Sequence, residues 1–530
     1  MVEERKQREN RNKRKAGLEV GLVATLILLL FRIPLAKIIG DEGNGYLAIS
    51  WEIYSIFYLI FGYGYSKVAC HMVQSRVSKE LYRNSIKAME NVFVTGFFSS
   101  LLGGILLFFL AKPIGGLFFS ANMVEISLKI FAPLMVLNCL VGIFRGCFEG
   151  MGTMVPTNIS KLVEAIITAT GTFLFAFVAG NYGAKIGALL HNEHFKAGFF
   201  AAGVVAGYLC GSILAGLFLS FVYILHKKGY NRLLKKDITR TLETRGKLVQ
   251  MIFLALPLTV LEVFFVKLYR LVNLYLYGHY QLQGENRQAG INLIGSFYGR
   301  ISVLMTLAIV IILFLVEEKQ KKGKKHFSQN EFKSGKQLIT EQLEKLFALA
   351  IPIAASFPVL SSVLLKALYG SGGKNDSLLL GIGGITVLFI SLGVYLGRIM
   401  LNLGRKKELI SFQIAAFVLQ TVMVFLLSRV KAGESFSLAD LSLGIGELVF
   451  WIVFSISQLF GLIKFYRMRL PWGRMLIVPI LQTSVMLLVE IMFVQLLKNT
   501  LPAWLLCILA IILGTIFHQL TRKVPVLNME

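Results

Sequence analysis

Acidic residues are scarce in this chain. Its 530 residues include 29 Asp and Glu against 55 Lys and Arg, which gives a formal net charge of +26 at pH 7. The five Cys residues fall in or beside apolar runs without a CxxC pair, so neither a disulfide framework nor a cysteine metal site is predicted. Walker A, HExxH and GxSxG patterns are also missing. We therefore expect no enzymatic activity, no cofactor and no metal.

Long polar segments are equally rare. Hydrophobic residues make up 55% of the chain and aromatic residues 12%, and the mean hydropathy is +0.68. These values do not describe a soluble domain of this length. The longest polar segment, 317–345, is too short to be a folded domain outside a membrane. The composition predicts an all-α polytopic membrane protein.

Fourteen apolar stretches are each about long enough to cross a bilayer as a helix. They lie at 17–38, 46–74, 91–111, 125–148, 157–180, 199–225, 248–276, 291–316, 346–369, 377–403, 409–428, 441–463, 475–497 and 501–520.

The basic residues predict the orientation of these spans. With the amino terminus inside, the cytoplasmic segments hold 36 Lys and Arg and the outer loops hold eight. That asymmetry follows the positive-inside rule and places both termini in the cytoplasm. The net charge could suggest nucleic acid, but a basic cytoplasmic surface facing anionic headgroups explains it more simply. We expect membrane lipids as partners and no nucleic acid.

The positions of the basic segments divide the chain into two six-span lobes and two further spans. A weak internal similarity supports this division. FEGMG at 148–152 ends span four and MLNLG at 400–404 ends span ten, each preceded by an arginine, Arg145 or Arg398. Duplicated transporter halves show such matching elements, although chance similarity explains these few residues as well. The predicted parts are a basic tail at 1–16, an N-lobe at 17–225, a linker at 226–247, a C-lobe at 248–463 and a final pair of spans within 464–530.

Eleven Lys and Arg remain within the predicted spans, where charge is costly and usually functional. Arg32 lies about nine residues from the polar loop 40–45, which puts it roughly 13 Å deep at 1.5 Å per residue. Lys267 and Arg270 are three residues apart and share a helix face. An internal ion pair and a water-filled cavity are both compatible with such residues. For these three and for Arg300 we favour a cavity.

Acids also lie within the spans. Glu52 is in span two, and Glu262 adjoins the face of Lys267 and Arg270, where it can partly neutralise them. Arg145 and Glu164 flank the cytoplasmic end of spans four and five, where a gate and a structural ion pair fit equally well.

A cavity with several fixed cations selects an anionic group such as a phosphate or pyrophosphate. The planar fork of arginine suits that geometry. A transporter of organic cations would need an acidic lining instead. The charges favour an anion-bearing substrate without specifying it.

Several motifs resemble one family of transporters. The segment RGCFEGMGTMVPTNISKLVE at 145–164 resembles the span four to five signature of polysaccharide and oligosaccharide flippases. Weaker likenesses are AKIIGDEGNGY at 36–46, GYGYSKVA at 62–69, AAGVVAGYLCG at 201–211 and MLNLGRK at 400–406. Together they resemble the stage V sporulation protein B-like branch of the multidrug/oligosaccharidyl-lipid/polysaccharide (MOP) exporter superfamily.

The resemblance implies a MATE-like fold of about fourteen helices, in two six-helix lobes plus two C-terminal helices, that works by alternating access. It also implies a bacterial plasma membrane location and a polyprenyl-pyrophosphate-linked oligosaccharide or cell-wall precursor as cargo. The span-one arginine of the family corresponds to Arg32 as a headgroup contact, and the glutamate of the signature corresponds to Glu164.

We therefore expect a flippase, with envelope glycan-synthesis enzymes as further partners. A cation-coupled multidrug antiporter, a membrane glycosyltransferase or polymerase, and a non-transporting envelope-assembly scaffold are the alternatives. The expected substrate-binding residues are Arg32, Lys267, Arg270, Arg300 and Arg398, and the expected coupling or gating residues are Glu52, Glu164, Glu262 and Arg145.

Overall fold

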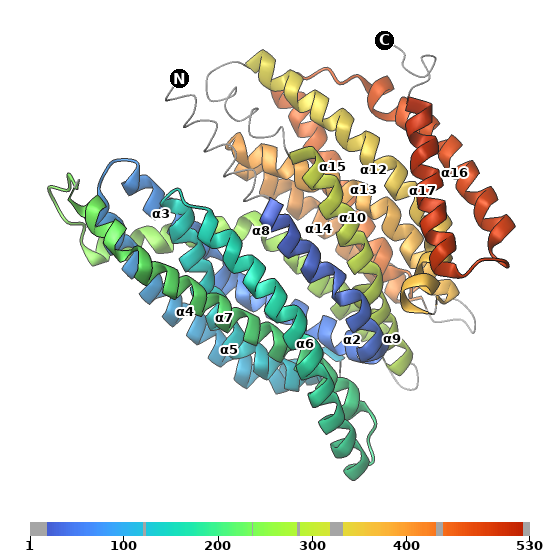
Figure 1. Ribbon diagram of the computed structural model, residues 1–530, viewed down its shortest axis with the longest axis horizontal. Helices are drawn as coiled ribbons and strands as arrows, with labels where there is room; N and C mark the ends of the chain where they lie inside the picture. The colour runs from blue at the N-terminus through green and yellow to red at the C-terminus, as the bar shows by residue number, and fades with distance from the viewer. Residues whose placement is uncertain are drawn as a thin grey trace. The chain divides into compact units, whose positions relative to one another are not determined.

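The computed structural model describes most of the chain, namely residues 19–119, 123–235, 237–282, 287–317, 332–370, 372–430 and 438–522. Within these ranges the secondary structure is helical throughout and contains no strand (Figure 1). The predicted basic tail at 1–16, the centre of the polar loop at 318–331 and the last residues from 523 lie outside the described residues.

The chain forms two compact units, one running to Leu271 and the other starting at Val272. The helices of the first unit are α2 (Arg32–Tyr58), η1 (Leu59–Tyr63), α3 (Gly64–Val77), α4 (Tyr82–Phe119), α5 (Met123–Gly150), α6 (Val155–Leu189), α7 (His194–Leu234) and the first part of α8 (Arg245–Gln281).

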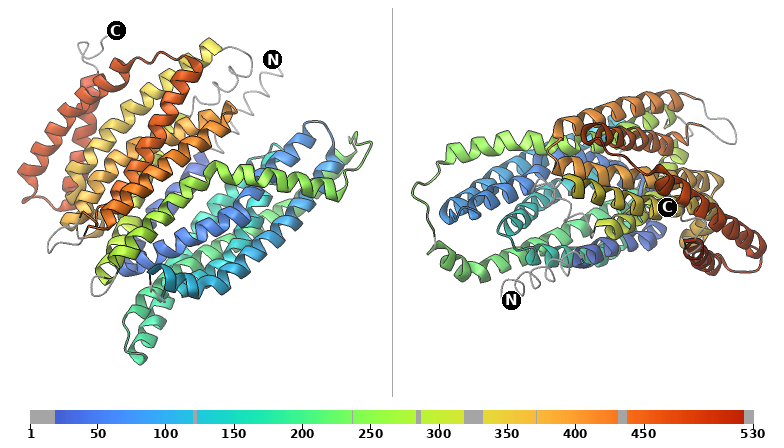
Figure 2. Two further views of the ribbon diagram at one scale, coloured as in Figure 1. Left: turned by 180° about the vertical axis from the view of Figure 1, so that it is seen from behind. Right: turned by 90° about the horizontal axis from the view of Figure 1, so that it is seen from above.

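The second unit begins with the end of α8. Its further helices are α9 (Arg287–Ser296), η3 (Phe297–Ile301), α10 (Ser302–Glu317), α12 (Phe332–Tyr369), α13 (Lys374–Asn402), α14 (Lys406–Ser428), α15 (Ser442–Tyr466), η4 (Gly473–Ile477), α16 (Val478–Leu497) and α17 (Ala503–Arg522). Helix α13 packs against α12 and α15, and the pair α16–α17, red in Figure 2, packs against α12.

Thirteen helical runs in the described ranges are long and apolar enough to cross a membrane. One of them, Glu19–Val77, has 59 residues and would extend roughly 90 Å, far beyond a hydrocarbon core of about 30 Å. Gly40 interrupts it with φ 75° and ψ 172°, a conformation that essentially only glycine adopts. This run therefore supplies two spans, which brings the total to fourteen. The predicted all-α polytopic fold is confirmed.

The reversal at Gly40 differs from the polar loop that the sequence predicts between the first two spans. Helical residues continue on both sides of the glycine. The buried amide of Asn44 donates hydrogen bonds to the carbonyl oxygens of Ala36, at 2.9 Å, and Gly40, at 2.7 Å. These bonds satisfy carbonyls that the break would leave unpaired, so an extended loop is unnecessary.

Small residues bring α6 and α7 together, side by side in Figure 1. A Cβ atom at Gly203 would lie 2.4 Å from the carbonyl oxygen of Phe175, and one at Gly207 would lie 2.4 Å from the backbone nitrogen of Thr172. These contacts are backbone to backbone, as expected for small residues at a helix interface in lipid.

The two similar glycine motifs end their helices with the same turn. After α5, Thr153 N donates to Phe148 O at 3.0 Å and Gly152 has φ 85°. After α13, Arg405 N donates to Met400 O at 2.9 Å and Gly404 has φ 76°. Both are left-handed glycine turns of the Schellman type, so the sequence similarity corresponds to a shared local structure.

Candidate functional site

The first unit brings charged residues of α2 and α8 together. Glu52 of α2 is 5% exposed, and its Oε1 atom lies 4.0 Å from Nη1 of Arg270 on α8. Ser55 donates a hydrogen bond to the other carboxylate oxygen of Glu52 at 3.4 Å. A carboxylate this deeply buried needs such partners, since an isolated charge in a low-dielectric interior is very costly.

Lys267 is the second cation beside Glu52. It lies on α8 within electrostatic range of both Glu52 and Arg270, and it is exposed. No ion pair or side-chain hydrogen bond joins its ammonium group to any residue that the structure describes. The group of Glu52, Lys267 and Arg270 therefore carries one negative and two positive charges, and its uncompensated cation is accessible. We call it the α2–α8 charge cluster.

Glu262 has a different cation from those that the sequence placed nearest to it. Its Oε2 atom lies 3.2 Å from Nζ of Lys67 on α3. A Cβ atom at Gly64 would lie 2.8 Å from Oγ1 of Thr259, so α3 and α8 approach closely at this glycine. Three residues further along each helix, Lys67 meets Glu262. The sequence offered no signal for this pair, because 195 positions separate its members.

Arg32 lies on the first leg of α2 and is half-buried. Its guanidinium makes no ion pair or side-chain hydrogen bond with any of the described residues. A half-buried arginine without a protein anion can bind an anionic ligand, as the sequence predicts for this residue.

Arg145 and Glu164 form a direct ion pair between α5 and α6, with 2.6 Å between Nη2 and Oε2. Arg145 Nε also donates to Ser160 Oγ at 2.9 Å. The sequence placed these two residues at the same end of adjacent spans, and the structure brings them into contact. Their exposed fractions of 15% and 22% show that the pair is largely shielded.

A chain of polar side chains leads from this ion pair to α2. Ser212 Oγ of α7 lies 3.5 Å from Glu164 Oε1 and 2.8 Å from Asn138 Oδ1 of α5. Asn138 Nδ2 donates to the hydroxyl of Tyr54 at 2.8 Å. Residues of four helices thus form one hydrogen-bonded row. Sequence analysis missed Ser212, Asn138 and Tyr54; their polar groups within apolar runs were the available signal.

The remaining predicted cations belong to the second unit. Arg300 lies in the π-helical turn η3 and is 8% exposed. Its guanidinium stands 5.4 Å from the ring centroid of Tyr369, whose hydroxyl donates to the carbonyl oxygen of Arg300 at 3.3 Å. Arg398 is exposed on α13. Single π-turns are frequent at functional sites, which keeps Arg300 a candidate.

Comparison with known proteins shows where this architecture occurs. Residues 18–317 match the model of the polysaccharide biosynthesis protein family. The chain is also similar to the uncharacterized membrane protein YabM of Bacillus subtilis, at 21% identity over 387 residues that cover 72% of this chain and 68% of that protein.

Solved structures share the fold. An inward-facing multidrug resistance MATE family transporter of the MOP superfamily aligns with a TM-score of 0.60 and 12% identity, covering 84% of this chain and 95% of its own. The lipid II flippase MurJ, in an inward closed conformation, aligns with a TM-score of 0.56 and 16% identity, covering 94% and 98%. The family match extends over more than half of the sequence, and the fold is that of the MOP superfamily. The chain therefore belongs to the polysaccharide biosynthesis protein family of MOP-superfamily membrane proteins.

Proposed function

We propose that the protein is a flippase that moves a polyprenyl-pyrophosphate-linked oligosaccharide or cell-wall precursor across the bacterial plasma membrane by alternating access. The α2–α8 charge cluster is the observation that carries this proposal, because it places an accessible, uncompensated cation within a predicted span. Membership of a polysaccharide biosynthesis family and the fold shared with a lipid II flippase support a lipid-linked glycan as cargo.

In this mechanism Lys267 and Arg270 bind the pyrophosphate while the glycan crosses the membrane. Arg32, Arg300 and Arg398 are the further headgroup contacts that we assign. Outward movement of negative charge is favoured by an inside-negative potential, by about 2.3 kcal/mol per charge per 100 mV. The cycle then needs no ATP.

Acidic residues give the cycle a means of coupling. Protonation of Glu52 would release Arg270 from its carboxylate partner and make a second cation available to the headgroup. Glu262 holds Lys67 in the same manner. The Arg145–Glu164 pair, with its hydrogen-bonded row to Tyr54, acts as a gate whose opening requires the ion pair to separate.

A cation-coupled multidrug antiporter is the nearest alternative, since MATE transporters share the fold. Such a transporter needs an acidic group available to an organic cation. In the first unit Glu52, Glu164 and Glu262 each already lie beside a basic side chain. The charge pattern therefore favours an anionic cargo. A glycosyltransferase, a polymerase and an assembly scaffold would each require features outside the cluster, and envelope glycan-synthesis enzymes remain proposed partners of the flippase.

A flipping assay in proteoliposomes tests the proposal. The cargo is a fluorescent polyprenyl-pyrophosphate oligosaccharide, and its appearance in the outer leaflet is measured by dye quenching under an applied potential. We expect the Lys267→Ala, Arg270→Ala variant to lose at least 90% of the initial rate, as expected when a charge-assisted phosphate contact of 1.5 kcal/mol or more is lost.

Lys129→Ala is the matched control, because Lys129 is a basic residue in a span that pairs with Glu125 one turn away, at 2.6 Å. It should keep the wild-type rate. Full activity in the double variant, with both proteins monodisperse and equally thermostable, would refute an anionic headgroup site at the α2–α8 charge cluster.

A further inference from the structure

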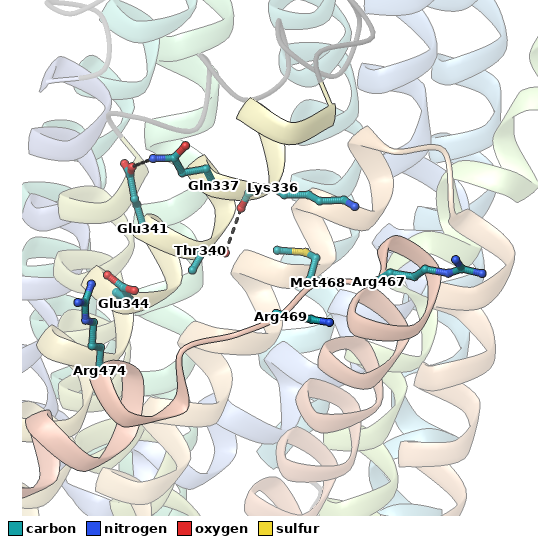
Figure 3. Close-up of a pocket in the computed structure, with 9 residues that line it drawn as sticks. All are labelled: Lys336, Gln337, Thr340, Glu341, Glu344, Arg467, Met468, Arg469 and Arg474. Atoms are coloured by element: carbon teal, nitrogen blue, oxygen red, sulfur yellow. Dashed lines mark hydrogen bonds between the residues drawn. The ribbon is translucent and has the colours of Figure 1, made fainter. Parts of the chain in front are cut away.

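The second unit contains a pocket that the proposed transport cycle does not use. Its volume is about 420 Å³, and it lies between the start of α12 and the segment that joins α15 to η4. Figure 3 shows the nine residues that line it: Lys336, Gln337, Thr340, Glu341, Glu344, Arg467, Met468, Arg469 and Arg474. Under the predicted orientation this end of the helices faces the cytoplasm.

Four of the nine lining residues are cations without protein anions. Lys336, Arg467, Arg469 and Arg474 make no ion pair with any residue in the described ranges. Two acids also line the pocket, so its lining carries a net positive charge. Unpaired like charges gathered in one concave site repel one another, and an anion bound between them removes that repulsion.

The charges are also unevenly placed. In Figure 3, Glu341, Glu344 and Arg474 lie on one side of the pocket, whereas Lys336, Arg467 and Arg469 lie on the other. On the first side Gln337 Nε2 lies 3.4 Å from Glu341 Oε1. We call Lys336, Arg467 and Arg469 the three-cation side.

The backbone presents these cations through an unusual turn. Arg467 follows the last residue of α15 in the left-handed conformation, with φ 46° and ψ 49°. That conformation normally selects glycine and costs an arginine about 1 kcal/mol or more. The chain reverses there, buries Met468 and exposes Arg467 and Arg469 on either side of it.

The next helical run reinforces the positive potential. It begins at Gly473, and its first turn contains Arg474 and no acid. A helix amino terminus carries a partial positive charge that usually attracts Asp or Glu, so a basic residue there leaves the potential uncompensated.

We propose that this pocket binds a phosphate-bearing anion, held by Lys336, Arg467 and Arg469. A lipid headgroup of the cytoplasmic leaflet and a soluble phosphate compound share this chemistry. A bound anion would join the start of α12 to the α15–η4 segment, and so to the base of the α16–α17 pair. The site is separate from the transport cations and does not depend on the proposed cargo.

Native mass spectrometry of the full-length protein tests the proposal. The protein is titrated with phosphatidylglycerol or phosphatidylcholine, with and without inorganic pyrophosphate as a competitor. The titration is repeated in the Lys267→Ala, Arg270→Ala background, which removes the contribution of the α2–α8 charge cluster. We expect selective retention of phosphatidylglycerol, or of pyrophosphate itself, in both backgrounds.

Three changes separate the pocket from general surface charge. The Lys336→Gln, Arg469→Gln variant should bind the anion about thirty-fold more weakly, at a contribution of about fivefold per basic residue. Glu344→Gln should bind it more tightly. Arg467→Gly should weaken binding about fivefold without loss of thermal stability, because glycine fits the left-handed conformation.

The Lys406→Gln, Lys407→Gln variant is the matched control, since it removes two exposed cations predicted to lie on the same membrane side but outside the pocket. Retention of phosphatidylglycerol that pyrophosphate does not displace identifies a lipid headgroup. Displacement by pyrophosphate identifies a soluble phosphate ligand. Equal losses in the pocket and control variants, or none in either, would overturn the proposal.

Discussion

Lys67 of α3 and Glu262 of α8 form an ion pair, with 3.2 Å between Nζ and Oε2. The carboxylate is 7% exposed and the lysine 38%, so the anion is shielded while its partner reaches it from a more open position. The pair lies three residues beyond the point where Gly64 allows α3 and α8 to come close. A single glycine thus positions a charged contact between residues that are far apart in the sequence.

Loss of the lysine should destabilise the first unit. We expect Lys67→Ala to lower stability by about 1–2 kcal/mol, less than for a fully buried pair because the lysine is partly solvated. Lys67→Arg preserves the charge and should retain most of the stability. The midpoint of thermal unfolding in detergent, followed by tryptophan fluorescence, measures both. Equal midpoints for the alanine variant and the wild type would show that the pair contributes nothing.

The break at Gly40 should depend on its backbone conformation rather than on space. No atom lies within 4 Å of a Cβ added at Gly40 or at Gly116, but only Gly40 has a positive φ. We expect Gly40→Ala to cost about 1–3 kcal/mol. Gly116→Ala, within helix α4, should be neutral or stabilising by up to about 1 kcal/mol. Similar unfolding midpoints for the two variants would contradict the proposed strain.

The Arg145–Glu164 pair should affect transport more than folding if it acts as a gate. Arg145→Ala and Glu164→Ala should each reduce the flipping rate at least tenfold, and the double variant should be no slower than the worse single variant. The non-additive result is expected because either change already breaks the 2.6 Å contact. Multiplicative losses in flipping rate would indicate two independent roles instead of one gate.

The linker before α8 should detach from the first unit in acid. Burial alone would raise the pKa of Asp237, but the hydrogen bonds from Thr239 Oγ1 and the backbone N–H of Arg83 outweigh it and hold the pKa below its usual value. Because the folded-state pKa is lowered, the stabilisation is present at neutral pH and is lost as pH falls below the usual range of Asp. Amide hydrogen exchange at residues 237–243, corrected for intrinsic rates, should therefore rise in acid.

Asp237→Asn provides the control for this titration. It should exchange faster than the wild type at neutral pH and show little further change in acid. A wild-type exchange profile independent of pH, or identical profiles for the two proteins, would exclude the carboxylate as the attachment of the linker.

Features that depend on local sequence were predictable. The length and hydropathy of each run predicted the spans, because a bilayer imposes both on any helix that crosses it. Arg145 and Glu164 were correctly associated because they flank one short turn between adjacent helices. The paired glycine motifs at 148–152 and 400–404 likewise predicted a common element, and the hydrogen bonds of both turns agree with it.

Features that depend on distant contacts were not predictable. Nothing near Lys67 in the sequence indicates Glu262, and the row from Glu164 to Tyr54 joins single polar residues of four helices. The phosphate pocket escaped for a related reason. Its cations come from two segments that were interpreted only as basic cytoplasmic loops, and the left-handed turn at Arg467 has no glycine to announce it.

The glycines of α7 have a consequence for the route of a lipid tail. At Gly203 and Gly207 the backbones of α6 and α7 are in van der Waals contact, so no acyl or polyprenyl chain can pass between these two helices. A tail that remains in the bilayer while its headgroup crosses must leave the protein through an opening elsewhere. The seam between α6 and α7 is a closed wall along that path, and any side chain larger than hydrogen at these positions would force it apart.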